Sequence, residues 1–186
     1  MVVEPIRDKD KILGMKKVLR QRGGDYELLF IMGLNTALRI GDLLSLSIAD
    51  VTNGEGKVLD VIHLRERKTG KQKRLPVNKT LKKALTDYMI EHPDRERSEP
   101  LFTSRKGSVL SRTQAWRVLK AAGKYVGLGN IGTHSLRKTF GYHVYKNCGD
   151  INLLQKLLNH SAAKNTLRYI GIDRDKMDNV YMKLNL

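Results

Sequence analysis

The chain has 186 residues, of which 40% are hydrophobic, so it is long enough to bury the core of one large domain or two small ones. Its 35 Lys and Arg residues against 19 Asp and Glu residues give a net charge of +16, which favours a polyanionic partner: DNA or RNA first, an anionic membrane surface second. A single cysteine, Cys148, excludes an intrachain disulfide, and the longest apolar run, residues 28–34, is too short to span a membrane.

Hydrophobic periodicity predicts a mostly helical chain. An amphipathic helix is expected over residues 10–21 and ends at a Gly-Gly pair. Asp25 is then a plausible N-cap for a helix over residues 26–38, which is apolar nearly all round and should be buried. A second short helical segment follows from about residue 41.

The pattern then changes to that of strands. Residues 57–66 and 72–77 have the composition of short strands, and the turn at Thr69-Gly70 between them predicts a β-hairpin. The polar loop at residues 91–100 is a candidate linker, but it is too short and too charged to mark a domain boundary. We therefore predict one domain of mainly α class with a small antiparallel β-sheet (α+β). Further helices are predicted at residues 79–91, 111–126, 135–147, 151–159, 163–169 and 175–183.

The predicted hairpin carries the densest basic patch of the chain. Successive residues of a strand alternate between its faces, so these side chains cannot all meet one partner. A basic hairpin suits contact with a phosphate backbone, but Lys residues also keep an exposed sheet edge soluble. One acid, Glu66, lies among six basic residues: Arg65, Arg67, Lys68, Lys71, Lys73 and Arg74.

Two further positions carry cations beside apolar segments. His134 and Arg137 are three residues apart and share one helix face, an arrangement that suits a phosphate; the alternative is a capping His and a surface Arg. Arg39 lies between two apolar helical segments, where an unpaired charge is too costly. Asp42 is its obvious partner, either in a plain salt bridge or as the carboxylate that holds Arg39 in a site.

The C-terminal part of the chain offers a tyrosine and a histidine. His160 follows an apolar stripe, and Tyr169 comes nine residues later, flanked by Leu167 and Ile170. Taken alone, Tyr169 is interpreted as a residue of the core. A zinc site is not supported, because no common ligand spacing fits the residues that could form one: His134, His143, Cys148 and His160.

Taken in order, these residues match a known pattern. An Arg in T-A-L-R-I-G-D, a Lys in a basic hairpin, an H-x-x-R pair and a His nine residues before a Tyr together resemble the phage-integrase family of tyrosine recombinases. The resemblance covers about residues 10–175 and six separate positions. It implies a mostly helical catalytic domain with a small sheet, which cuts DNA without a metal or nucleotide cofactor. The implied function is site-specific recombination, such as integration or excision of mobile DNA.

The resemblance also implies a role for each candidate residue. Tyr169 would attack a scissile phosphodiester and give a 3′-phosphotyrosyl link and a free 5′-hydroxyl. His134 would help to take the tyrosine proton, and Lys68, or Lys71 across the turn, would protonate the leaving oxygen. The remaining residues would hold the phosphate or orient its ligands: Arg39 and Arg137 as a clamp, His160 as a hydrogen-bond donor, and Asp42 as the acid that orients the Arg39 region.

Two departures from the family pattern lie beside these residues. Ala37 and Asn159 stand where the family often has glycine, and asparagine tolerates a left-handed turn. Neither position carries a catalytic group, so the resemblance still implies an active enzyme.

The resemblance sets expectations for domains and partners. Only about nine residues precede the first predicted helix, so residues 1–186 are expected to form a catalytic domain without the family's N-terminal DNA-clasping domain, either as a fragment or as a short natural member. The expected partner is double-stranded DNA and not a membrane. The full-length protein would form a homotetramer on DNA, and the isolated domain would be monomeric. Residues 174–186 would form a tail helix that contacts a neighbouring subunit. The expected location is the cytoplasm of a bacterial or phage-infected cell, at the nucleoid.

Three other functions compete with this interpretation. A type IB topoisomerase-like enzyme uses the same chemistry without strand exchange, but the compact spacing and the tail favour a recombinase. A non-catalytic DNA-binding module should lack one of the six residues, and all six are present. An RNA-binding domain should expose aromatic side chains for stacking, and the 6% aromatic content gives that little support.

Overall fold

The computed structural model describes residues 3–104, 107–160 and 162–184, most of them in helices. Two strands and one 3₁₀ turn complete the set of described elements. In chain order the elements are α1 (Lys9–Arg22), α2 (Gly24–Thr36), α3 (Ile40–Leu43), η1 (Ile48–Asp50), β1 (Val61–Arg65), β2 (Gln72–Pro76), α4 (Lys79–Glu91), α5 (Arg112–Tyr125), α6 (Thr133–Cys148), α7 (Ile151–Leu157), α8 (Ala163–Ile170) and α9 (Ile172–Lys183).

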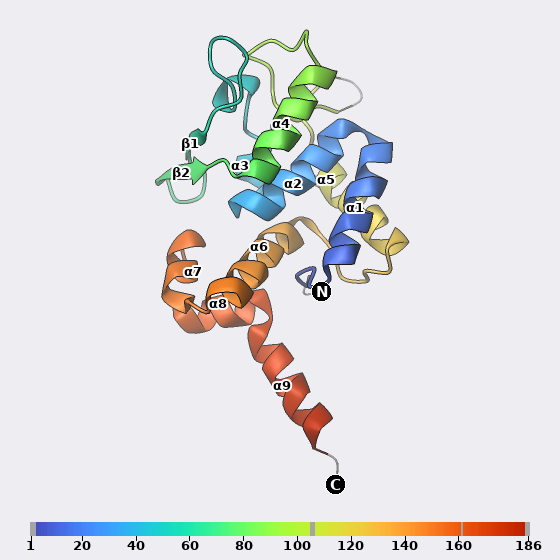
Figure 1. Cartoon of the computed structure of the whole chain (residues 1–186), viewed down its shortest axis with the longest axis vertical. Helices are drawn as coiled ribbons and strands as arrows, with labels where there is room; N and C mark the ends of the chain where they lie inside the picture. Colours follow the sequence, from blue (N-terminus) through green and yellow to red (C-terminus); the bar gives the residue numbers. More distant parts are fainter. Residues whose placement is uncertain (1–2, 105–106, 161, 185–186) are drawn as a thin grey trace.

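Helix α2 is the element around which the first half of the chain packs (Figure 1). It is apolar on nearly every side, and Phe30 and Met32 are completely buried. Burial of a side chain of this size stabilises the fold by about 1.5–3 kcal/mol. Gly33 lets α6 approach α2 closely, because a Cβ at that position would lie 2.5 Å from Leu136 Cδ1. A larger residue at position 33 would therefore push α6 away from α2.

Strands β1 and β2 form a two-stranded antiparallel sheet at one side of the molecule (Figure 1). Leu64 pairs with Lys73, which sets the register of the hairpin. The turn is closed by two backbone hydrogen bonds, from Glu66 N to Lys71 O at 2.9 Å and from Gly70 N to Glu66 O at 2.8 Å. Gly70 has a φ of 66°, a left-handed conformation that glycine adopts without strain.

Helices α6, α7 and α8 enclose a second apolar region below α2 (Figure 1). The N-terminal segment is fixed to α6, because Ile6 N donates a hydrogen bond of 2.7 Å to Thr139 Oγ1, while the Ile6 side chain packs in the cluster of Met15, Leu19 and Phe30. The buried members of the region come from the α2–α3 connection and from α7 to α9: Ala37, Leu154, Leu158, Ile170 and Ile172.

Helix α9 extends away from the rest of the chain (Figure 1). Its first turn is anchored by an ion pair of 2.8 Å between Arg7 Nη2 and Asp175 Oδ1. Beyond that turn its apolar side chains are exposed, with Tyr181 at 77% and Val180 at 68% of full exposure. Residues 185 and 186 of the expected tail lie outside the described residues.

The fold confirms the predicted class, a mainly helical chain with a small antiparallel sheet. Each predicted helix and both strands are present within a few residues of their expected bounds. The predicted N-cap at Asp25 is wrong. Helix α2 begins at Gly24 with Gly23 as its N-cap, because Gly23 adopts a φ of 136° that starts the helix earlier. No helix among the described residues is long and apolar enough to cross a lipid bilayer.

Candidate active site

Tyr169 lies half-buried on α8, in a cationic environment. The ring of His160 meets it edge-on, with 4.9 Å between the ring centroids. The Lys138 ammonium lies 5.2 Å from the centroid of the tyrosine ring. Burial raises the pKa of the Tyr169 phenol, and the positive charges of Arg137 and Arg39 oppose that rise only in part. The phenol is therefore protonated in the resting protein and needs a base before it can attack.

The ring of His160 is held by Thr166, one helical turn into α8. His160 Nδ1 lies 3.1 Å from Thr166 Oγ1, and that hydroxyl donates its own proton to Ala162 O at 3.2 Å. The hydroxyl oxygen therefore accepts the bond from Nδ1–H, which leaves Nε2 for a substrate. Burial and then the charges of Arg137 and Arg39 lower the pKa of His160, so its imidazole is neutral at neutral pH.

Arg137 is buried in α6 with 3% of its surface exposed. Its guanidinium donates one hydrogen bond to the carbonyl of Ala37 and one to the carbonyl of Leu158. Ala37 and Asn159 have φ angles of 56° and 48°, and among the described residues they are the non-glycine positions with positive φ. A left-handed residue with a Cβ costs about 1–2 kcal/mol. The strained turns of the described chain thus lie at the two segments that hold Arg137.

Arg39 is the residue before α3 and has an extended backbone, with φ of −70° and ψ of 148°. Its Nη1 lies 3.2 Å from Glu66 Oε1, which forms its ion pair. Asp42 is 2% exposed and accepts a hydrogen bond of 2.9 Å from Arg67 N on the hairpin. The expected Arg39–Asp42 pair is therefore corrected. In this structure Glu66 pairs with Arg39, and Asp42 binds the backbone of the hairpin turn.

Glu66 is a fully buried carboxylate that reasoning from the sequence did not place in the site. Its Oε2 accepts hydrogen bonds from Thr69 Oγ1 at 2.7 Å and from Asn159 Nδ2 at 3.0 Å. Burial raises the pKa of this carboxyl, but these bonds and the charges of Arg39 and Lys73 outweigh burial, so its pKa lies below its usual range. The sequence signal was a lone acid within a run of six basic residues.

The hairpin lysines differ in their surroundings. Lys68 and Lys71, the two candidates for the general acid, are exposed at the turn. The side chain of Lys73 is only 13% exposed, and its Nζ donates a hydrogen bond of 3.1 Å to Leu157 O at the end of α7. Burial and the charge of Arg137 lower the pKa of Lys73. The remaining basic side chains of the predicted DNA-binding patch are exposed: Arg65, Arg67 and Arg74.

His134 lies in the first turn of α6, one turn before Arg137. Its side chain is exposed, yet the protein around it and then the charges of Arg137 and Lys138 lower its pKa. A neutral imidazole at this position can accept a proton at neutral pH. The structure thus brings Arg39 into the region of Arg137 and Tyr169, although 130 residues separate Arg39 from Tyr169 in the sequence.

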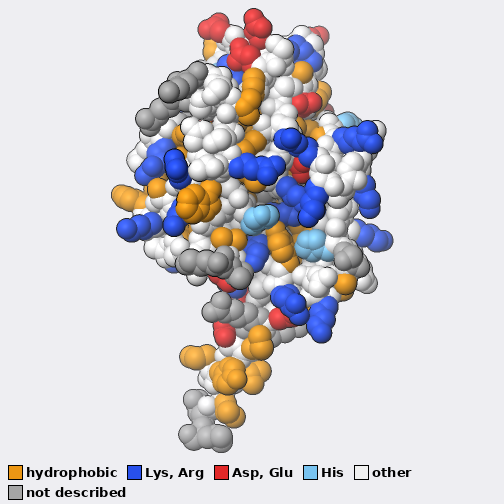
Figure 2. All heavy atoms as spheres, turned by 180° about the vertical axis from the view of Figure 1, so that it is seen from behind, with side chains coloured by type: hydrophobic (Ala, Val, Ile, Leu, Met, Phe, Trp, Pro, Cys, Tyr) orange, Lys and Arg blue, Asp and Glu red, His pale blue; other side chains and the backbone are white. Residues whose placement is uncertain are grey.

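The surface around this region is strongly basic. Figure 2 shows Lys and Arg side chains gathered around histidine side chains on one face of the molecule. The same view shows hydrophobic side chains along the protruding C-terminal helix (Figure 2). With a net charge of +16, this face attracts a polyanion over distances of about 8–10 Å at physiological salt.

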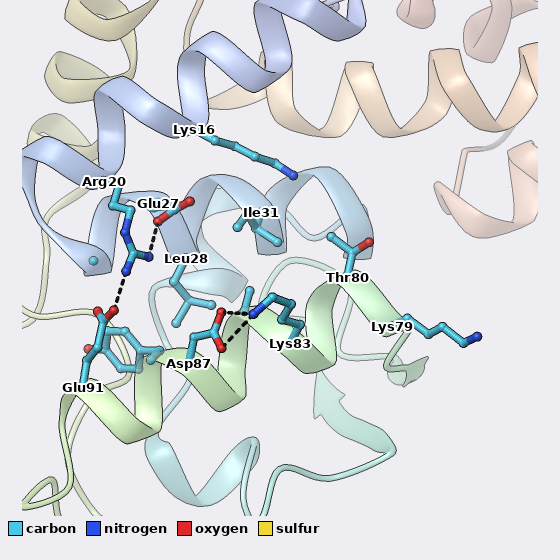
Figure 3. Close-up of a pocket in the computed structure, with 13 residues that line it drawn as sticks. Lys16, Arg20, Glu27, Leu28, Ile31, Lys79, Thr80, Lys83, Asp87 and Glu91 are labelled. Carbon is cyan, nitrogen blue, oxygen red and sulfur yellow. Dashed lines mark hydrogen bonds and ion pairs between the residues drawn. The ribbon is translucent and has the colours of Figure 1, made fainter.

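A separate pocket of about 420 Å³ lies between α1, α2 and α4 (Figure 3). Leu28 and Ile31 lie on its α2 side, and none of the residues discussed above lines it. Its charged groups pair with one another: Arg20 Nη1 lies 3.0 Å from Glu27 Oε2, and Lys83 Nζ lies 2.9 Å from Asp87 Oδ2 (Figure 3). Lys16 and Lys79 also line this pocket, which is distinct from the region around Tyr169 (Figure 3).

Comparison with known proteins agrees with this geometry. The family model described as the phage integrase family matches residues 12–175. The chain is 43% identical over 175 residues to "Probable integrase/recombinase YoeC" of Bacillus subtilis (strain 168), covering 94% of this chain and 92% of that protein. It is 30% identical over 150 residues to the tyrosine recombinase XerD of Corynebacterium glutamicum, covering 78% of this chain but only 48% of that protein.

Solved structures share the fold. The crystal structure of XerA recombinase superposes with a TM-score of 0.76 at 22% identity, covering all of this chain and 68% of that one. A lambda integrase dimer bound to a COC′ core site superposes with a TM-score of 0.68 at 20% identity, covering 91% of this chain and 49% of that one. With the family match over residues 12–175 and the 43% identity to a relative covered over 92% of its length, the chain belongs to the phage integrase family.

Proposed function

We propose that this protein catalyses site-specific DNA recombination by cutting and rejoining strands through a 3′-phosphotyrosyl intermediate. The observation that carries the proposal is the convergence of Tyr169 and His160 with Arg137 and Arg39, whose charges both act on the phenol. This arrangement combines a nucleophile with cations that match a phosphate. The membership of the phage integrase family supports the same reaction.

We propose the following steps for this reaction, with the roles that the family resemblance implies. The Tyr169 oxygen attacks the scissile phosphorus as its proton passes to His134, so that a P–O(Tyr) bond forms. The bond from phosphorus to the 5′-oxygen breaks, and that oxygen takes a proton from a hairpin lysine. We propose Lys68 for this role, with Lys71 across the turn as the alternative; Lys73 is the hairpin lysine that is buried beside Glu66. Reversal of these steps with a second 5′-hydroxyl rejoins the strands without ATP.

Arg39 and Arg137 are proposed to clamp the non-bridging oxygens in the transition state, where preorganised cations stabilise the developing charge. His160 donates to the same phosphate through Nε2, which requires that the phosphate raise its pKa on binding. Side-chain cations supply the positive charge in this scheme, so we propose a metal-independent reaction with no cofactor. The substrate is double-stranded DNA in the cytoplasm, contacted outside the site by the exposed residues Arg65, Arg67, Lys71 and Arg74. Lys73 was expected in the same patch, but its side chain is largely buried beside Glu66.

We expect cleavage to depend on pH through His134. Because its pKa lies below the ordinary value of about 6.5, the base is neutral at neutral pH and is lost by protonation as the pH falls. The cleavage rate should therefore be level near pH 7 and decline only as the pH falls below the ordinary histidine range. Single-turnover cleavage rates of the wild type and of His134→Ala, measured across pH, test this. If the rate of the variant declines at acid pH as the wild-type rate does, a group other than His134 is responsible for the decline.

We propose that residues 1–186 act as a catalytic domain and that the tail helix, residues 174–186, packs on a neighbouring subunit. The exposed apolar side chains of α9, such as Tyr181 and Val180, support the second point. The chain spans about half the length of XerD, and recombination by the full-length protein is proposed to use a homotetramer, with the isolated domain monomeric.

Truncation tests the role of the tail. Removing residues 174–186 should weaken assembly on DNA, because the apolar contacts between subunits are lost, while single-site DNA binding persists. Sedimentation of protein–DNA complexes and the yield of joined products measure the two effects. A truncated chain that assembles and recombines like wild type would contradict the proposal.

Covalent capture tests the proposed reaction directly. The protein is incubated with nicked duplex fragments from its source DNA, so that the short cleaved strand diffuses away and the adduct accumulates. After denaturation, protein-linked DNA is sequenced and the modified peptide is identified by mass spectrometry. We expect adducts with shared ends and a nucleotide on the peptide that contains Tyr169. Absence of an adduct both here and with a longer natural form would refute the proposal.

A further inference from the structure

Glu66 stands out within the site because it joins three separate parts of the chain. Its carboxylate has no solvent exposure and contacts Arg39 before α3, Thr69 in the hairpin turn and Asn159 between α7 and α8. Lys73 Nζ lies 3.9 Å from Oε1 of the same carboxylate. A buried carboxylate persists only where cations and hydrogen-bond donors offset the loss of solvation. Of these contacts, Arg39 is a group placed in the reaction above, Thr69 follows Lys68 in the chain, and Asn159 precedes His160.

The contacts of Glu66 fix the turn on both sides of Lys68. On one side the backbone N–H of Glu66 bonds to Lys71 O, and its carbonyl accepts from Gly70 N. On the other side the Thr69 hydroxyl donates to the carboxylate at 2.7 Å. Lys68 lies between these two anchored residues in the sequence. The carboxylate therefore limits where the backbone of Lys68 can go, although the lysine side chain is exposed.

The other contacts of Glu66 hold the turn against the phosphate-binding groups. The ion pair with Arg39 links the turn to the α2–α3 connection, and the bond from Asn159 links it to the residue before His160. Asn159 has a φ of 48°, so its backbone depends on local contacts to stay in this conformation. A single carboxylate thus sets the distance between the lysine turn and two residues that would meet the phosphate.

We propose that Glu66 is a positioning residue that locks the lysine-bearing turn onto Arg39 and Asn159, so that the general acid is placed before DNA binds. This inference rests on the proposed function and deepens it. Glu66 does not touch the reacting atoms; it acts through the lysine, whose proton must reach the leaving 5′-oxygen. The lowered pKa of Glu66 agrees with a carboxylate that stays ionised among these cations.

The first test replaces the carboxylate by its neutral isostere, Glu66→Gln. We expect the single-turnover cleavage rate at saturating DNA to fall by about 10–100-fold, the range for misplacing a general acid. DNA affinity should not fall, because the change removes a buried negative charge from a strongly basic region and so leaves the attraction for DNA no weaker. Glu55→Gln is the matched control, since Glu55 is an exposed carboxylate paired with Lys57. The substrate is a nicked duplex that carries the site recovered by covalent capture.

The second test changes the leaving group. A duplex with sulfur in place of the bridging 5′-oxygen releases a thiolate, which needs no proton from a general acid. If Glu66 positions the lysine, the rate lost in Glu66→Gln should be largely regained on the sulfur substrate, as it should for Lys68→Ala. Thr69→Val removes only the hydrogen bond between the turn and the Glu66 carboxylate. We expect a smaller loss of cleavage rate, which the sulfur substrate should also restore. This exposed substitution keeps the test open if Glu66→Gln fails to fold.

The outcomes distinguish a failure of the positioning role of Glu66 from a failure of the proposed function. Equal losses on both substrates, for Glu66→Gln and Thr69→Val alike, would overturn the positioning role. So would a Glu66→Gln rate that matches Glu55→Gln. Failure of the wild type to form any adduct on either substrate would instead remove the proposed function, and the role of Glu66 with it.

Discussion

Replacing Tyr169 with phenylalanine is expected to abolish the covalent protein–DNA adduct completely while leaving the fold and DNA binding intact. The change removes the nucleophilic oxygen and nothing else from the side chain. The phenyl ring keeps its edge-on contact with His160 and its place below the Lys138 ammonium. Adduct formation on nicked DNA, measured after denaturation, and a mobility shift with the same DNA test the two halves of the prediction.

Tyr142→Phe is the matched control for this experiment. Tyr142, on α6, is half-buried like Tyr169 and also lies beside cations, with the Arg7 guanidinium 5.5 Å from its ring centroid. It should therefore show any general effect of losing a hydroxyl near positive charge, and we expect it to form adducts at the wild-type level. Adducts from Tyr169→Phe would show that another residue is the nucleophile.

The helices and the hairpin follow from local features of the sequence. Amphipathic periodicity places α1 and α4, and the uniformly apolar α2 is buried because no side of it can face water. The Thr69-Gly70 turn follows from the left-handed conformation that Gly70 adopts. Each of these features depends on residues a few positions apart, so the sequence alone is sufficient to predict them.

The contacts of the buried charges could not be predicted in the same way. Asp42 is the nearest acid to Arg39 in the sequence, but the structure pairs Arg39 with Glu66, which is 27 residues away. Which strand face of the hairpin turns inward depends on how the sheet docks beside α7, and that docking brings Lys73 to Leu157 O. An alternating run of basic residues carries no sign of its docking partner. The lone acid at Glu66 was the one local signal.

The site contains two turns in which a residue other than glycine has a left-handed backbone conformation. Ala37 and Asn159 both take left-handed conformations, and the carbonyls of Ala37 and Leu158 accept hydrogen bonds from Arg137. Conformational strain at these turns is offset by bonds to a buried cation. Arg137 therefore supports the shape of the site as well as its charge, and this dual role predicts the effect of replacing it.

Arg137→Lys should lower the cleavage rate by about 100–1000-fold, the range for losing one preorganised donor in a transition state. Lysine keeps the positive charge but lacks the planar fork that donates to two carbonyls and a phosphate together. One buried carbonyl, of Ala37 or Leu158, then loses its partner, at a cost of about 1–3 kcal/mol. Single-turnover kinetics on nicked DNA and thermal unfolding measure the two consequences.

The matched control is Arg22→Lys, which makes the same change at an exposed arginine near the end of α1. It should leave both the rate and the unfolding temperature unchanged. A lower unfolding temperature in Arg137→Lys with normal cleavage would make Arg137 a structural residue only. A slow rate with an unchanged unfolding temperature would instead assign its fork to the phosphate rather than to the two carbonyls. Because the buried guanidinium contacts both strained segments, we expect the rate and the stability to fall together.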